Sequence, residues 1–196
     1  MTHTHRLLTL AMASLLLTGT MAARASSQAA RRAPAASTPT TDTARLERGE
    51  YLVRVAACHD CHTPFAMGPN GPAPDMTRAL SGHPQELVMP PAPPAVGPWI
   101  GHVGATNTAW AGPWGVSFSA NLTPDPETGL GSWTEEMFLA TVRTGRHQGK
   151  GRAILPPMVI PALQAATDED LKSIFRYLQT VRPIRNKVPA PIEPAE

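Results

Sequence analysis

The pentapeptide Cys58-His59-Asp60-Cys61-His62 decides how the rest of the chain is interpreted. It is a C-x-x-C-H motif, which is typical of covalent attachment of a c-type haem. Each thiol can add across one of the two vinyl groups of a porphyrin, and the adjacent imidazole can then reach the iron. The motif therefore predicts one haem c, attached through Cys58 and Cys61, with His62 as an axial iron ligand.

Three other interpretations of a C-x-x-C pair are a thioredoxin-like dithiol, half of a zinc site and a short disulfide. No βαβ pattern surrounds the pair, and with 2 cysteines in all the chain cannot complete a cysteine-rich zinc site. None of these interpretations needs His62. A haem-free secreted binding module with a Cys58–Cys61 disulfide is kept as an alternative of a different class.

The N-terminal segment, residues 1–25, has the pattern of a secretory signal peptide. Arg6 provides the positive charge, an apolar run extends from Leu7 to about Met21, and Ala23-Arg24-Ala25 matches an A-x-A cleavage site. The apolar run is shorter than the ~20 residues that span a bilayer. We therefore expect cleavage near Ala25 and a periplasmic protein with no transmembrane anchor.

Composition narrows the possible partners. The chain has 17 Lys and Arg against 15 Asp and Glu, but two arginines lie in the predicted signal peptide, so the remainder carries 15 of each sign. Nothing in this balance favours a nucleic acid or an anionic membrane as a partner. Aromatic residues are 5% of the chain and prolines number 22, so a buried porphyrin would supply apolar area that the side chains lack.

The remaining chain is divided by its patterns into a linker at 26–43, a domain at 44–190 and a tail at 191–196. A helix is predicted from Ala44 to Ala57, and Gly49 inside it favours a close approach by another helix. Residues 64–117 are rich in proline and glycine and are predicted to be mostly irregular, as an excursion around the haem edge.

Two further helices are predicted towards the C-terminus. Ser132 with Glu135 has the pattern of a capping box for a helix that reaches about Thr144 and ends at Gly145. Thr167 with Asp170 begins a second amphipathic helix, which stops before Pro183.

Met158 is the predicted sixth iron ligand. It follows Ile154-Leu155-Pro156-Pro157, whose prolines are expected to stiffen an extended segment, and a thioether opposite an imidazole raises the iron potential. The ordinary alternative is a methionine that fills a gap in the core. His147 in a glycine-flanked turn is the second candidate ligand, and His83 and His102 in the long loop are further conceivable ones.

The order of these features resembles that of a class I c-type cytochrome with one haem. The stretch Phe118-Ser119-Ala120-Asn121-Leu122-Thr123-Pro124-Asp125 and the stretch Leu155-Pro156-Pro157-Met158 are similar to the haem domains of cytochrome c subunits of periplasmic alcohol- and aldehyde-type dehydrogenases. The resemblance extends from about Arg45 to Pro189. It implies an all-α cytochrome c fold with a long Pro/Gly-rich insertion, in which the N- and C-terminal helices cross at Gly49, opposite Phe175 or Tyr177.

The resemblance also implies a function and two further haem contacts. Asn121 and Thr123 would lie beside the haem and hydrogen-bond a propionate. The protein would be a single-electron carrier and not an enzyme, with a dehydrogenase as donor and another cytochrome or an oxidase as acceptor. Many such subunits carry two or three haems, whereas this chain has one motif. The alternative within haem chemistry is a five-coordinate or bis-His haem in a peroxidase or gas sensor.

Overall fold

The computed structural model describes residues 42–94 and 97–194. The predicted signal peptide and nearly all of the predicted linker at 26–43 lie outside the described residues. Among the helices of the described part, none is long and apolar enough to cross a membrane.

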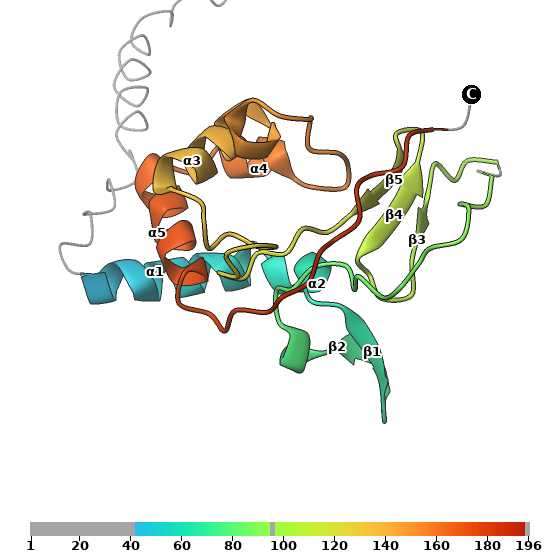
Figure 1. The fold of residues 1–196 in the computed structure, drawn as a ribbon, viewed down its shortest axis with the longest axis horizontal. Coiled ribbons are helices and arrows are strands. Elements are labelled where there is room, and N and C mark those ends of the chain that lie inside the picture. Colours follow the sequence, from blue (N-terminus) through green and yellow to red (C-terminus); the bar gives the residue numbers. More distant parts are fainter. Residues whose placement is uncertain (1–41, 95–96, 195–196) are drawn as a thin grey trace, which may run out of the picture. The chain divides into compact units, whose positions relative to one another are not determined.

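Helices α1 (Asp42–Val55) and α5 (Asp168–Leu178) lie against each other, away from the strands β3 to β5 at residues 102–118 (Figure 1). Gly49 permits this contact. A Cβ atom at Gly49 would lie 2.0 Å from the carbonyl oxygen of Ser173 and 2.7 Å from the Cβ of Tyr177. The predicted close approach at Gly49 and the predicted neighbour Tyr177 are therefore confirmed.

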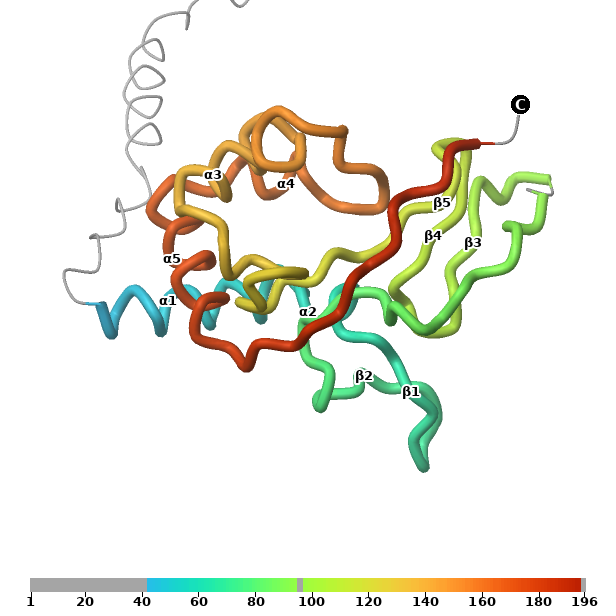
Figure 2. The backbone as a smooth tube through the Cα atoms, in the orientation of Figure 1, coloured from blue at the N-terminus to red at the C-terminus, as the bar shows by residue number. Residues whose placement is uncertain are grey.

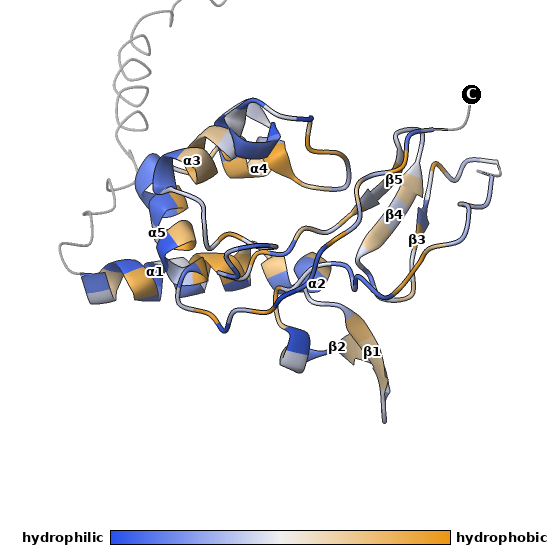
Figure 3. Cartoon of the chain, viewed as in Figure 1, coloured by the Kyte–Doolittle hydropathy of each residue, from blue (hydrophilic) through white to orange (hydrophobic). Residues whose placement is uncertain are grey.

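The core is built around one face of α5. The Thr167 hydroxyl caps this helix by accepting a hydrogen bond from the Asp170 amide, as predicted. Figure 3 shows apolar and polar residues alternating along the α5 ribbon, as expected of a helix with one buried face. The buried core residues come from α1, α3, α5 and two loops: Val53, Leu80, Leu130, Val142, Leu171, Ile174, Phe175 and Leu178.

Helix α3 (Glu135–Thr144) begins at a different cap from the predicted one. Thr134, and not Ser132, is the N-cap, because its hydroxyl accepts a hydrogen bond from the Met137 amide at 3.2 Å. The helix ends at Gly145, whose φ of 65° lies in the left-handed region that favours glycine. The predicted helix and its end are thus confirmed, and the predicted capping box is wrong.

The segment predicted to be irregular contains short antiparallel strands. Strands β1 (Phe65–Gly68) and β2 (Gly71–Pro74) form a hairpin, and β3 (His102–Val103), β4 (Ala109–Gly112) and β5 (Gly115–Phe118) form a sheet in the order β3-β4-β5. The described chain is therefore rich in helix but not all-α. Strands of two to four residues with prolines and glycines give no period-2 pattern that could predict them.

The C-terminal segment after α5 runs back across the domain to the sheet, as the red tube in Figure 2 shows. Ile192, predicted to lie in the tail, exchanges backbone hydrogen bonds of 2.8 and 2.9 Å with Val116 of β5. Asn186 anchors the middle of this segment and is 1% exposed. Its Nδ2 donates to the carbonyls of Ser81 and His83 at 2.7 and 2.8 Å, and its Oδ1 accepts from the Gln85 amide at 2.9 Å.

Replacing Asn186 with aspartate should lower the free energy of unfolding by roughly 2 to 4 kcal/mol, because a buried carboxylate would face two carbonyl oxygens. Guanidinium unfolding of the full protein measures this loss. Gln148→Glu adds the same charge at an exposed position and serves as the control. An Asn186→Asp variant as stable as Gln148→Glu would contradict the anchoring role.

Candidate haem-binding site

The C-x-x-C-H motif forms a short helix of its own, α2 (Cys58–His62), directly after α1. Ala56 and Ala57 separate the two helices, and Ala57 has a left-handed φ of 55°, which turns the chain between them. Cys58 and Cys61 stand one helical turn apart. Both are partly buried and are not bonded to each other.

The two thiols do not have the properties of a redox-active dithiol. Burial raises the pKa of the Cys58 thiol to about 11. Burial, together with the nearby Asp60 carboxylate, also raises the pKa of Cys61. Reactive dithiols need a pKa lowered towards neutrality, so the thioredoxin-like interpretation is disfavoured.

His62 is buried, with 7% of its surface exposed, and its ring is oriented by the backbone. Its Nδ1 lies 2.8 Å from the carbonyl oxygen of Ala120. A carbonyl can only accept, so Nδ1 carries the proton and Nε2 keeps its lone pair. Burial also lowers the pKa of His62, which favours the neutral ring. A neutral imidazole held through one nitrogen is the usual form of a metal-ligating histidine.

Three hydrogen bonds hold α2 and the residue that follows it in place around His62. The Gly82 amide donates to the His62 carbonyl at 2.8 Å, the Leu80 amide donates to the Thr63 hydroxyl at 3.0 Å, and the Asn107 side chain donates to the Asp60 carbonyl at 2.7 Å. Gly82 has φ of 78°, and a Cβ there would lie 2.6 Å from the Ala120 carbonyl oxygen. A side chain at Gly82 would thus disturb the group that orients His62.

Met158 lies in a turn and not in the predicted extended segment. Pro156 and Pro157 are joined by a cis peptide bond, the Met158 amide donates to the Leu155 carbonyl at 3.3 Å, and helix α4 (Ile160–Gln164) follows. The Met158 side chain is 36% exposed, so it is not a buried core residue. The Ser117 hydroxyl of β5 donates to the Pro156 carbonyl at 2.5 Å and ties this turn to the sheet.

The segment from Ser117 to Ala120 therefore joins the two predicted ligand regions. Its first residue holds the turn that carries Met158, and its last residue holds the ring of His62. The second of these bonds is made only three residues after the first. Free thiols one turn apart and an oriented neutral imidazole are the groups that hold a c-type haem, so these residues fit this cofactor. The tethered turn with Met158 offers a candidate second ligand.

Asn121 and Thr123 are 4% and 0% exposed, and their polar atoms bond to other parts of the protein. Asn121 Nδ2 donates to the Ile184 carbonyl at 2.8 Å, and Asn121 Oδ1 accepts from the Thr123 amide and hydroxyl. The Thr123 hydroxyl accepts from the Ile184 amide at 3.1 Å. These bonds give both residues a structural role, and a propionate contact stays a prediction.

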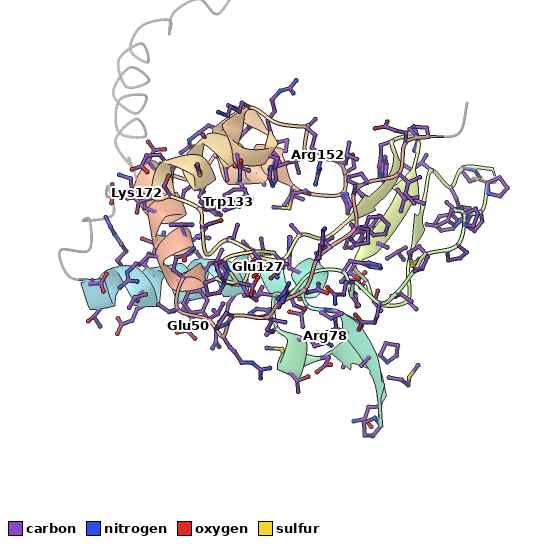
Figure 4. The ribbon with its side chains drawn as sticks, viewed as in Figure 1. Glu50, Arg78, Glu127, Trp133, Arg152 and Lys172 are labelled. Atoms are coloured by element: carbon purple, nitrogen blue, oxygen red, sulfur yellow. The ribbon has the colours of Figure 1, made fainter. Side chains whose placement is uncertain are left out.

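The alternative histidine ligands differ in how their rings are held. His83 is 0% exposed; its Nδ1 lies 3.0 Å from the Thr108 hydroxyl and its Nε2 lies 2.9 Å from the Leu87 carbonyl, so neither nitrogen is free for iron. The exposed His147 forms a T-shaped contact with Trp133, with ring centres 5.2 Å apart. Trp133 is labelled in Figure 4. His102 is exposed in β3.

The pKa of His83 is lowered by burial, and this predicts an acid dependence of stability. The unfolded chain takes up the proton at about pH 6.5, before the folded protein does. The contribution of His83 to the free energy of unfolding should thus be complete above about pH 6.5 and be lost as the pH drops towards the lowered pKa. Guanidinium unfolding at a series of pH values should show a smaller slope for His83→Gln than for the exposed control His102→Gln. Equal slopes for the two variants would contradict His83 as the source of this pH dependence.

Sequence reasoning missed Ser117, Ala120 and Gly82 as residues that support the site. Ala120 acts through a backbone carbonyl, which every residue has, so no side-chain signal could identify it. Ser117 is separated from Pro156 by 39 positions, and no local pattern predicts that contact. Gly82 precedes a histidine in a proline-rich stretch, where a glycine indicates only a turn.

The described site has the features of a c-type haem-binding domain: the C-x-x-C-H motif on a helix, with its histidine oriented by a backbone carbonyl.

No family model matches the chain. It is 28% identical over 151 residues, or 76% of its length, to the cytochrome c subunit of the quinone alcohol dehydrogenase of Gluconobacter oxydans, and covers 24% of that relative. It is also 28% identical over 134 residues to the gluconate 2-dehydrogenase cytochrome c subunit of Pantoea cypripedii, covering 68% of this chain and 22% of the relative.

A third relative is the fructose dehydrogenase cytochrome subunit of Gluconobacter japonicus, 29% identical over 71% of this chain and 22% of the relative. The chain is thus similar to cytochrome c subunits of dehydrogenases. It spans about a quarter of the length of these three relatives.

Proposed function

We propose that the protein is a periplasmic single-electron carrier with one covalently attached haem c. The proposal rests chiefly on His62, whose neutral ring is oriented through Nδ1 while Nε2 stays free for iron. Cys58 and Cys61 would hold the haem by thioether bonds. Met158 would be the second axial ligand, delivered by the turn that Ser117 anchors.

The bound haem would supply one-electron exchange between ferrous and ferric iron. The protein's own residues would set the conditions for this exchange. The Ala120 carbonyl accepts a hydrogen bond from Nδ1–H of His62 and so raises the basicity of the Nε2 atom that would bind iron. A thioether at Met158 favours the ferrous state. With both axial positions filled by side chains, no site would remain for oxygen or peroxide, which favours electron transfer over peroxidase or gas-sensing chemistry.

The comparisons support a dehydrogenase as the electron donor, because the relatives are named as subunits of alcohol, gluconate and fructose dehydrogenases. The acceptor would be another cytochrome or an oxidase. The single motif here allows one haem, so we propose that electrons pass between this chain and separate redox proteins. Small, weak interfaces suit such transient exchange.

An absorption spectrum of the protein purified from the periplasm tests this function. We expect c-type bands in the ferrous state, one haem per chain, and a weak far-red band in the ferric state that reports methionine ligation. A high-spin ferric spectrum would instead indicate a five-coordinate haem. A haem-free protein with a Cys58–Cys61 disulfide would support the binding-module alternative.

A further inference from the structure

We propose that Ser117 is a positioning residue for Met158: its hydroxyl holds the Pro156 carbonyl and thereby keeps the methionine thioether available to the iron. This inference rests on the His/Met ligation of the proposed function. It adds a residue that would control how firmly the methionine stays bound.

The hydrogen bond itself is short, and its donor residue is buried. Ser117 is 7% exposed, and its Oγ donates to the Pro156 carbonyl at 2.5 Å, whereas its contact with the Trp110 carbonyl is 3.4 Å long. Pro156 and Pro157 have no N–H groups, so their backbone can be held only through carbonyl oxygens. A hydroxyl donor is therefore well suited to fix this turn.

The turn has little other support. The bonds of the Met158 and Ile160 amides to the Leu155 and Met158 carbonyls are local. Within residues 42–94 and 97–194, the Ser117 bond is the one hydrogen bond that joins residues 155–159 to a segment beyond 145–166. Met158 is 36% exposed and lies outside the buried core cluster. Packing in the core cluster therefore does not hold its position.

The segment of the donor has more hydrogen bonds to other segments than the turn that carries the acceptor. Ser117 pairs with Trp110 of β4, and its neighbour Val116 is bonded in both directions to Ile192. Three residues after Ser117, the Ala120 carbonyl orients His62. Ser117 thus connects the turn that carries Met158 to the segment whose Ala120 carbonyl orients His62.

Removing the hydroxyl should shift the ferric protein towards a state in which Met158 is detached. One lost hydrogen bond corresponds to roughly fivefold in that equilibrium. An external ligand that competes with methionine reports this shift, because its apparent affinity follows the detached fraction. We therefore expect Ser117→Ala to bind imidazole roughly fivefold more tightly than the wild-type ferric protein and to lose its far-red band at a lower temperature.

Three further variants make the test specific. Ser117→Thr keeps the hydroxyl and should bind imidazole like the wild type, whereas Ser117→Val has nearly the same shape without the hydroxyl and should bind like Ser117→Ala. The comparison of Ser117→Val with Ser117→Thr tests the role of the hydroxyl even if Ser117→Ala does not fold with haem. Ser119→Ala removes a hydroxyl that has no hydrogen bond within the described residues and should leave the imidazole affinity unchanged.

The possible outcomes separate this inference from the proposed function. A wild-type ferric spectrum without the far-red band would overturn His/Met ligation itself. A wild-type band with equal imidazole affinities for the Val and Thr variants would overturn the role of Ser117 alone. Tighter imidazole binding by Ser119→Ala to the same degree would also overturn it, since general loosening of the segment from Ser117 to Ala120 would then explain the effect.

Discussion

Replacing Met158 with alanine should abolish the far-red ferric band and lower the reduction potential by roughly 0.1 to 0.3 V, within the span that axial ligands control. The thioether favours ferrous iron, and the vacated position would take water or another side chain. The covalent bonds from Cys58 and Cys61 should keep the haem in place. A ferric absorption spectrum and a redox titration measure the two effects.

His147→Ala is the matched control, because His147 is the other candidate for the sixth ligand. Its ring contacts Trp133 at the protein surface, and its removal should leave the far-red band and the potential essentially unchanged. Loss of the band in His147→Ala, or an unchanged band in Met158→Ala, would contradict Met158 as the ligand.

Replacing Gly49 with alanine should be among the most destabilising single changes in the described domain. Alanine is favoured over glycine in a helix by about 1 kcal/mol. Here, however, the added Cβ would lie 2.0 Å from the Ser173 carbonyl oxygen and 2.7 Å from the Tyr177 Cβ, so α1 and α5 would have to separate. We expect a net loss of roughly 2 to 3 kcal/mol in the free energy of unfolding.

Guanidinium unfolding of the haem-loaded protein measures this change. Gly68→Ala is a suitable control, since a Cβ at Gly68 in β1 would meet its nearest heavy atom at 3.4 Å, an ordinary contact. A Gly49→Ala variant at least as stable as the wild type would mean that the contact between α1 and α5 is not as close as described.

The features that sequence could predict are those encoded over a few neighbouring positions. The α5 helix has a threonine cap and an apolar stripe, and both are confirmed. Gly49 stands inside a helical pattern at a cost that a close approach by another helix would offset, and Ser173 and Tyr177 of α5 provide that contact. The C-x-x-C-H motif likewise gives both thiols and His62 within five residues.

The features that sequence could not predict depend on contacts between distant segments. The Ala120 carbonyl reaches His62 across 58 positions, and the C-terminal segment reaches Ser81 and His83 through Asn186 across more than 100. The small sheet β3-β4-β5 was missed because its strands are too short for a period of two to emerge. The cap of α3 was misplaced because Ser132 and Thr134 both suit that position, and only the structure shows which hydroxyl faces an amide.

The most direct test of the whole account is the intact mass of the purified protein, combined with acid-acetone extraction. The account predicts a mass that exceeds the polypeptide by one haem, with the pigment retained by the protein after extraction. In a Cys58→Ser, Cys61→Ser double variant this added mass should be absent. A wild-type protein with the mass of the bare polypeptide, or one that releases its pigment into acid acetone, would contradict covalent haem attachment and the function built on it.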